Sequence, residues 1–325
     1  AGRCTISTFH SFSAKLLRFY GAEYASQLTG SEAVDSSFTI CDQEDALKVV
    51  KELIKQELGA EDLTKLSIKP NAVLNAVNKI REAQVMTSYD CGGLVDTTEY
   101  KEILEGSGKT KTIRLARKIL PGYLERIYSA NSLDFEDLLL TSYKLLHIPD
   151  VLAKIQSRFR HILVDEYQDT NIPQYEIVRK LSPASYFTPH GLRDAPKSEY
   201  NSTRYDLDSR SLFCVGDKNQ AIYSWRGARP SNVESLGEHY PDLITYNLMT
   251  NYRCSPAIAE VANTVIGEVA TTTEVTKRRV EAVRVVSTHD DEDQARCVSS
   301  IIETIQNDGN AKMDIAVFYR TNSQS

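Results

Sequence analysis

The feature that most constrains the fold is a short apolar run that ends directly in two acids. Ile162, Leu163 and Val164 predict a strand of the kind that is buried in a parallel sheet. Asp165 and Glu166 follow, so they leave this strand at its carboxyl end. Because open α/β sheets bind ligands at that edge, the pair predicts a ligand site. Taken as a dipeptide alone, it is more typical of a cap on the next helix.

The rest of the chain alternates strand patterns with helix patterns. Further strands are predicted at 3–9, 211–217, 242–248, 280–287 and 314–320. Amphipathic helix patterns lie between most of them. This alternation predicts an α/β fold with a mostly parallel sheet.

Residues 32–131 depart from the alternation. They carry several amphipathic helix patterns and no strand pattern, which predicts an all-helical insertion. The last of these patterns, 111–128, contains Pro121, and a break is expected there. Residues 183–211 are rich in Pro, Ser, Asp and Arg without periodicity and predict a long surface loop.

Composition restricts the function less than the motifs do. The 325 residues carry a net charge of −6, which does not indicate a nucleic-acid-binding protein, although a local basic stripe would suffice for binding. No apolar run approaches the ~20 residues that span a bilayer. The six cysteines form no CxxC pair, a pattern that predicts reduced thiols in an intracellular compartment, cytoplasmic in a bacterium and nuclear or organellar in a eukaryote.

Three long motifs stand beside predicted strands: VDEYQDTN at 164–171, VGDKNQAIYSWRGA at 215–228 and NLMTNYRCSPAI at 247–258. In this order they resemble the superfamily 1 DNA helicases of the UvrD/Rep/PcrA type. The opening TISTFHSFSAKLLR, the short LDFEDLL and the closing DIAVFYRTNSQS resemble further motifs of that family. The resemblance implies a RecA-like P-loop NTPase lobe with a parallel sheet. It also implies ATP-driven, three-prime to five-prime movement on single-stranded DNA in repair, recombination or replication.

The resemblance implies a division of the chain into domains. Residues 1–31 and 132–264 would form the first RecA-like lobe, 32–131 the helical insertion and 265–325 the start of a second lobe. Single-stranded DNA and junctions of single- and double-stranded DNA are the implied partners.

Site residues for ATP are implied by position within the motifs. Asp165 would hold Mg²⁺ and Glu166 would activate the attacking water. Gln220 would sense the γ-phosphate, because an amide can donate to phosphate and accept from water. Arg253 would contact the γ-phosphate, and Tyr252 would stack near the adenine.

Aromatic residues beside a cation predict the DNA contacts. Tyr223, Trp225 and Arg226 lie within four positions, and single-stranded DNA is bound by stacking bases on rings and pairing phosphates with arginine. Their closeness to Gln220 suggests a route that couples phosphate sensing to base stacking.

Two further motifs contribute to the expected DNA track. Phe9 and His10, and Phe135 in LDFEDLL, match family positions there, although an aromatic residue such as Phe9 is equally compatible with a core role. The basic face within 111–118 is compatible with a solvated helix or with contact to duplex DNA.

The segment GSGKT at 106–110 resembles the end of a phosphate-binding loop. GxxxxGK[ST] requires a first glycine at position 103, which is Ile103, and a strand before it. We therefore expect a turn between two helices here. The phosphate loop and the family's last two motifs are expected outside this sequence, which would make it an internal fragment. Two alternatives stay open, a helicase–nuclease subunit of the RecB/AddA kind and a truncated product that binds DNA without hydrolysing ATP.

Overall fold

The computed structural model describes residues 4–58, 68–89, 98–105, 110–183, 210–223, 227–241, 243–248, 250–267, 274–275, 283–307 and 314–319. The chain divides into two compact units, Ala1–Ile244 and Thr245–Ser325. This division falls before residue 264, where the sequence analysis ended the first lobe, and the predicted domain ranges stay predictions. Each unit is described by itself.

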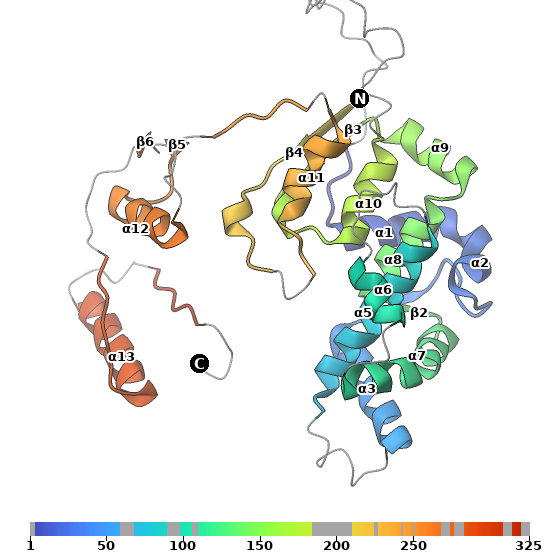
Figure 1. Ribbon diagram of the computed structural model, residues 1–325, viewed down its shortest axis with the longest axis horizontal. Coiled ribbons are helices and arrows are strands. Elements are labelled where there is room, and N and C mark those ends of the chain that lie inside the picture. Colours follow the sequence, from blue (N-terminus) through green and yellow to red (C-terminus); the bar gives the residue numbers. More distant parts are fainter. Residues whose placement is uncertain are drawn as a thin grey trace, which may run out of the picture. The chain divides into compact units, whose positions relative to one another are not determined.

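The first unit contains the parallel strand pair that the apolar runs predict. Strand β3 (His161–Val164) pairs with β4 (Ser211–Cys214), with His161 opposite Ser211 and Val164 opposite Cys214 (Figure 1). Helices α10 (Ile172–Leu181) and α11 (Ser231–His239) supply apolar side chains that pack with Val164 in a small core. The α/β class with parallel strands is confirmed, and Pro173 lies in the first turn of α10, where proline is well tolerated.

A larger core joins the insertion to the rest of the first unit. Helices of the insertion and of the segments before and after it build this core. These helices are α1 (Phe9–Leu16), α2 (Ala25–Thr29), α3 (Gln43–Leu58), α5 (Pro70–Ser88), α6 (Thr98–Glu105), α7 (Lys111–Ser129), α8 (Phe135–Leu145) and α9 (Pro149–Arg158). Short helical turns lie at Leu17–Gly21, Ala22–Tyr24, Tyr167–Asp169 and Lys218–Gln220.

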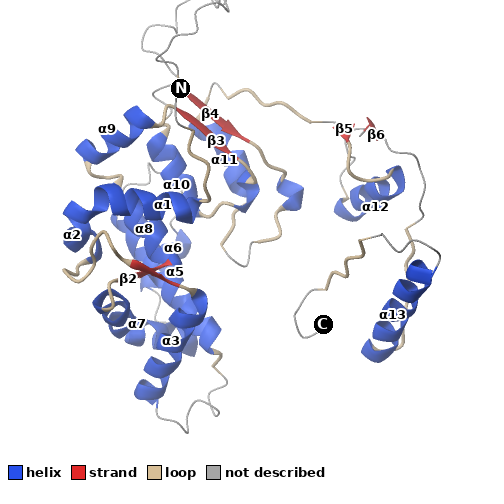
Figure 2. Cartoon of the chain, turned by 180° about the vertical axis from the view of Figure 1, so that it is seen from behind, coloured by secondary structure: helices blue, strands red, loops and turns tan. Residues whose placement is uncertain are grey.

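The sequence analysis expected an all-helical insertion, but the insertion also contains a strand. Strand β1 (Thr39–Cys41) lies within it and pairs in parallel with β2 (Ser132–Asp134), just beyond its predicted end (Figure 2). Two of the three β1 residues are exposed, so no apolar alternation marks the strand in the sequence. Only the distant partner strand makes this segment a strand.

Pro121 does not break its helix. Helix α7 runs from Lys111 to Ser129 with Pro121 inside it. A proline removes one backbone donor, but apolar side chains on both sides of it, including Ile119 and Tyr123, are buried in the large core. We attribute the continuity of α7 to this packing, which outweighs the lost hydrogen bond.

Several other predicted strands are absent from the described residues. The described parts of 3–9, 242–248, 280–287 and 314–320 are not strands, and apolar side chains such as Ile6, Val285 and Phe318 are exposed there. A strand requires a hydrogen-bonded neighbour. None of the described residues pairs with these runs as a neighbouring strand.

The second unit contains one short parallel pair and two helices in its described residues. Strand β5 (Thr250–Asn251) pairs with β6 (Glu274–Val275), and the helices are α12 (Pro256–Ile266) and α13 (Asp291–Asn307). Both helices were predicted from the sequence. No side chain of α13 is fully buried, and of its apolar residues Val298, Ile302 and Ile305 are partly buried.

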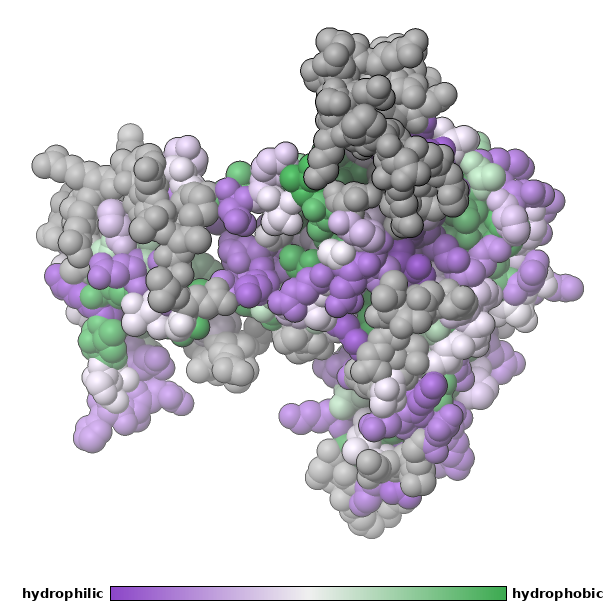
Figure 3. All heavy atoms as spheres, turned by 45° about the horizontal axis from the view of Figure 1, so that its top comes forward, coloured by the Kyte–Doolittle hydropathy of each residue, from purple (hydrophilic) through white to green (hydrophobic). Residues whose placement is uncertain are grey.

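The described helices and the described surface can be compared with what a bilayer requires. None of the helices in the described ranges combines the length and the apolar character needed to cross a bilayer. On the face in Figure 3, hydrophilic residues predominate and hydrophobic residues form separate small patches.

A buried ionic cluster fixes the insertion to α8. Arg81 of α5 contacts both Asp134 and Asp137, with Nη1 donating to Asp134 Oδ2 over 2.7 Å. Tyr123 and Tyr128 of α7 donate to the same two carboxylates over 2.6 and 2.7 Å. Arg81 and the Tyr123 hydroxyl hold the pKa of Asp134 below its usual value despite its burial, while burial and the neighbouring Asp134 carboxylate raise the pKa of Asp137 to about 6. Three segments of the chain are thereby joined at one charged centre.

Replacing Arg81 by alanine is expected to lower the free energy of unfolding by about 3–5 kcal/mol, because two buried carboxylates lose their cation. Urea unfolding monitored by circular dichroism measures this. Arg126 is the matched control, since it pairs with Glu52 at the surface over 2.7 Å and Arg126→Ala should cost about 0–1 kcal/mol. Equal losses in the two variants would contradict the role of the buried cluster.

Candidate functional site

The two motifs beside β3 and β4 leave the sheet at the same edge. Pairing continues past the strand ends, because Val215 N donates to Val164 O over 2.8 Å and Tyr167 N donates to Val215 O over 2.9 Å. Asp165 and Glu166 lie between these bonds and are exposed. The structure therefore places both acids at the carboxyl edge, where the sequence analysis expects the ligand.

Glu166 has a constrained backbone. Its φ is 50° and its ψ is 44°, a left-handed conformation that costs a non-glycine residue about 1–2 kcal/mol. Glu166 N donates to Asp165 Oδ1 over 3.0 Å, and Asp169 N donates to Glu166 O over 3.0 Å. Strained residues of this kind concentrate at functional sites.

Gln168 connects Glu166 to the motif after β4. Its Nε2 donates to Glu166 Oε2 over 2.7 Å, and its Oε1 accepts from Asp217 N over 3.1 Å. The side chain is almost completely buried, with 1% of the residue exposed. Asp217 Oδ2 in turn accepts from Gln220 Nε2 over 2.9 Å. Glu166 and Gln220 thus belong to one chain of hydrogen bonds.

The sequence analysis did not single out Gln168 or Asp217. The signal available in the sequence was the polar amide of Gln168, which stands two residues after Glu166. It lies within a segment that packs against the sheet. Its bridging role depends on the parallel register of β3 and β4, which a single sequence does not reveal.

Gly216 permits the close approach of these two motifs. A Cβ atom at this position would lie 2.7 Å from Gln168 Oε1, 3.2 Å from Gln168 N and 3.3 Å from Tyr167 N. Two of these atoms belong to the backbone and cannot rotate away. This position therefore requires glycine because a larger side chain would not fit, and not because of its backbone angles.

The chemistry of these residues suits a magnesium nucleotide. Mg²⁺ in such sites takes one or two carboxylates together with phosphate oxygens and water. Asp165 is exposed, and within the described residues only its Oδ1 accepts a hydrogen bond. No group of three or more His, Cys, Asp or Glu that could hold a metal occurs in the described parts of the chain. Coordination of Mg²⁺ by a single protein carboxylate together with phosphate oxygens is consistent with both observations.

Aromatic residues from two helix starts meet elsewhere in the first unit. The rings of His10 in α1 and Phe135 in α8 lie edge to face with centroids 5.3 Å apart. Thr8 caps α1, and Asp134 caps α8 as part of a capping box. These caps fix the first turns of both helices. Phe135 is 44% exposed, whereas Phe9 is half-buried and packs against the cores. Phe135 therefore offers an accessible ring, with the half-buried His10 packed against it.

The remaining predicted DNA residues follow Gln220. Tyr223 is partly exposed, at 37%, and its carbonyl accepts from Ala228 N over 3.3 Å. Trp225 and Arg226 lie outside the described residues. The long loop predicted at 183–211 also lies outside them, except at its two ends.

Tyr252 and Arg253 belong to the second unit. Tyr252 is 70% exposed, and Asn251 Oδ1 accepts from Arg253 N and Cys254 N over 2.9 and 3.0 Å. This turn leads into α12, which begins at Pro256. The two residues lie on one ordered turn within their own unit.

The GSGKT segment lies between two helices, as predicted. Residues 106–109 are outside the described ranges, but α6 ends at Glu105 and α7 begins at Lys111. Thr110 caps α7, with Oγ1 accepting from Ile113 N over 3.3 Å. A helix, not a strand, precedes the segment, so the requirement for a phosphate loop is not met.

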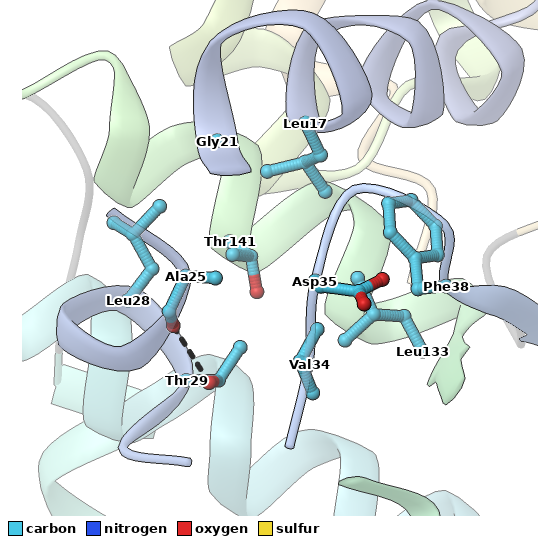
Figure 4. A pocket seen from close by; sticks show the side chains of 10 residues that line it. All are labelled: Leu17, Gly21, Ala25, Leu28, Thr29, Val34, Asp35, Phe38, Leu133 and Thr141. Atoms are coloured by element: carbon cyan, nitrogen blue, oxygen red, sulfur yellow. Dashed lines mark hydrogen bonds between the residues drawn. The ribbon is translucent and has the colours of Figure 1, made fainter. Parts of the chain in front are cut away.

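A small pocket also lies away from the motif residues. Its walls are mostly apolar and come from 17–38, from Leu133 of β2 and from Thr141 of α8 (Figure 4). Thr29 Oγ1 donates to Ala25 O over 2.7 Å at its rim. None of the predicted site residues lines it, and its mainly apolar lining does not suit a triphosphate.

Parallel strands with two exposed acids at their carboxyl edge place the first unit in the class of RecA-like α/β folds. Residues 1–241 match the UvrD/REP helicase N-terminal domain, and 246–325 match the UvrD-like helicase C-terminal domain. The chain belongs to the UvrD/REP helicase family.

Relatives with curated names support this assignment. The "ATP-dependent DNA helicase UvrD1" of Mycobacterium leprae is 30% identical over 98% of this chain and 37% of its own length, and that of Mycobacterium tuberculosis is 31% identical over the same shares. The "ATP-dependent DNA helicase PcrA" of Staphylococcus aureus is 29% identical over 98% of this chain and 38% of its own length. The chain thus spans less than two fifths of these relatives.

Gly216→Ala is expected to lower the free energy of unfolding by about 1–3 kcal/mol, because the added methyl group overpacks the contact with Gln168. Gly237 in α11 is the matched control. A Cβ there meets nothing within 4 Å, so Gly237→Ala should raise stability by up to about 1 kcal/mol through helix propensity. Thermal and urea unfolding measure both, and a neutral Gly216→Ala would contradict the tight contact.

His10 is expected to make the protein less stable in mild acid. Burial lowers the pKa of His10 from 6.5, so below that pH the unfolded chain takes up a proton before the folded chain does, and stability falls. His10→Gln should therefore lose less unfolding free energy than the wild type between pH 7.5 and 5.5. Urea titrations at the two pH values measure the difference. Identical losses would show that His10 is not buried in its neutral form.

Proposed function

We propose that the natural protein carrying this chain is an ATP-dependent DNA helicase that moves three-prime to five-prime along single-stranded DNA. Junctions between single- and double-stranded DNA are its proposed substrates, in DNA repair, recombination or replication. The observation that carries the proposal is the hydrogen-bonded chain from Glu166 through Gln168 and Asp217 to Gln220 at the carboxyl edge of β3 and β4.

The proposed hydrolytic step is divided among the residues of this edge. Asp165 would hold Mg²⁺, which supplies charge neutralisation at the phosphates when bound. Glu166 would orient the attacking water and accept its proton, and its left-handed backbone together with Gln168 fixes the direction of the carboxylate. Gln220 would contact the γ-phosphate through its amide.

Arg253 and Tyr252 are further proposed contacts of ATP. Arg253 would stabilise charge that develops on the γ-phosphate, since a guanidinium presents several donors in fixed geometry. Tyr252, which is exposed, would stack near the adenine. Closing and opening of two lobes around the nucleotide would drive movement.

DNA would be held by aromatic stacking. Phe135, with the half-buried His10 beside it, would offer one stacking ring, and Tyr223, Trp225 and Arg226 would offer a second site for bases and phosphates. Stacking on aromatic side chains is worth about 1–3 kcal/mol per base and tolerates any sequence. This suits a motor that must pass along DNA regardless of sequence.

ATP hydrolysis should depend on Glu166 and not on Lys109. In the natural protein with whatever residues flank this sequence, Glu166→Gln is expected to lower the turnover number with Mg²⁺ and oligo(dT) about 10²–10⁴-fold, since the general base is lost. Lys109→Ala is the control and should keep wild-type turnover, because its segment lies between two helices. A steady-state phosphate-release assay measures both.

Two outcomes would contradict the proposal. Full turnover in Glu166→Gln would remove the assigned base, and loss of turnover in Lys109→Ala would make GSGKT a working phosphate loop. Polarity is tested separately with duplexes that carry a three-prime or a five-prime single-stranded tail. Preferential unwinding of the five-prime-tailed duplex would overturn the proposed direction.

A further inference from the structure

The junction between the insertion and α8 holds more acid than its ionic cluster neutralises. Arg81 supplies the positive charge of that cluster, and its guanidinium donates to Asp134 and Asp137. A third acid, Glu136, stands between the two aspartates in the first turn of α8. Within the described residues, no hydrogen bond of Arg81 reaches Glu136.

Glu136 carries a buried oxygen that lacks a partner. The residue as a whole is partly buried, but its Oε1 is shielded from solvent and accepts no hydrogen bond from any described residue. An ionised carboxylate in this state has neither water nor a donor, which is strongly unfavourable. The positive end of α8 favours a negative charge there, but only to a modest extent. Burial therefore favours the neutral, protonated form of Glu136.

A neighbouring helix adds a further negative charge beside Glu136. Glu82 follows Arg81 in α5, and α5 packs against both α6 and α8 (Figure 1). The hydroxyl of Tyr100 in α6 donates to Glu82 Oε1, which gives Glu82 the kind of partner that Glu136 Oε1 lacks. Burial and then the charge of Glu82 raise the pKa of Glu136 well above its usual value, while Arg81 acts in the opposite direction.

The other polar groups around this junction are engaged elsewhere. They come from α7, α8, α1, β1 and the stretch before α11, and are Tyr123, Tyr128, Lys144, His10, Cys41 and Arg229. The two tyrosines donate to the aspartates, Lys144 Nζ donates to Leu28 O over 2.9 Å, and Arg229 lies over the Tyr100 ring. Burial lowers the pKa of His10 and raises that of Cys41 to about 11, so both are neutral at pH 7.

We propose that Glu136 carries a proton in the folded protein and that loss of this proton loosens the junction between the insertion and the first turn of α8. The proposal does not depend on the proposed function. When the acid ionises above neutral pH, repulsion from Glu82, Asp134 and Asp137 acts against the capping box. Phe135 stands in the same turn, so the position of its exposed ring follows the state of the junction.

Opening of the junction should become easier as the pH rises. In the open state Glu136 is exposed and ionises near the ordinary glutamate pKa of about 4.3, whereas the closed state keeps its proton to a higher pH. Between these two values, each pH unit increases the opening equilibrium constant up to about tenfold. Glu136→Gln keeps the shape of a protonated carboxyl group but does not titrate, so the increase should vanish in this variant.

Hydrogen exchange measured by mass spectrometry reports this opening constant in the natural protein with its flanking residues. The probes are peptides covering 134–139, because the capping box holds the amides of Asp134 and Asp137. Exchange is compared at pH 6.5 and 8.0, above the pKa of about 6 of Asp137, after correction for the chemical exchange rate. The wild type is expected to open about tenfold or more readily at the higher pH, and Glu136→Gln to change less than about threefold.

Glu52→Gln is the matched control, because Glu52 pairs with Arg126 at the surface of the insertion. Its opening should depend on pH as in the wild type. Infrared spectroscopy tests for the proton itself, since a protonated carboxyl group absorbs apart from carboxylates. At pH 7, the wild type and Glu52→Gln should share a carboxyl band that Glu136→Gln lacks.

Absence of this band from the wild type would overturn the proposal. A band without the increase in opening at pH 8.0, or an equal increase in Glu136→Gln, would overturn the link between the proton and the junction. If Glu136→Gln does not fold, Glu82→Gln decides. It keeps an acceptor for Tyr100 and removes the neighbouring charge, which lowers the pKa of Glu136, so the increase in opening should become smaller. An unchanged increase would count against the proposal.

Discussion

The candidate site depends on the parallel pairing of β3 with β4. Two motifs that stand some fifty residues apart in the sequence end at one edge because Val164 lies opposite Cys214 and the pairing continues through Val215. Every contact of Gln168 with Asp217 follows from this register. A shift by one residue would turn the side chains to the other face and separate the two motifs.

A second constraint acts on the aromatic edge of the first unit. Phe135 begins α8 directly after Asp134, and Asp134 is both the cap of that helix and a partner of Arg81. The position of an exposed ring thus depends on a buried charge from the insertion. Such a cluster is costly to desolvate, and here it joins β2, α8, α5 and α7 at one point. The position of the exposed Phe135 ring therefore depends on the packing of the insertion.

Much of the local structure was predictable because it depends on local chemistry. The apolar run at 161–164 and the run at 211–214 form strands, and α10, α12 and α13 form where their periodicity and caps indicate. Predictions failed where a distant partner decides. Strand β1 exists only because β2 lies beside it, α7 passes through Pro121 because its flanks are buried, and the apolar runs near the end of the chain find no described neighbour.

The sequence by itself determined the family, the order of the motifs and the residue types that carry the proposed chemistry, because these are properties of short stretches. It also identified GSGKT as a segment between helices, since spacing and preceding pattern are local. Only the tertiary structure decided how the motifs are joined. Gln168 and Gly216 acquire their roles from distances between segments that the register of β3 and β4 brings together. The packing of the whole core sets those distances, so no single motif predicts them.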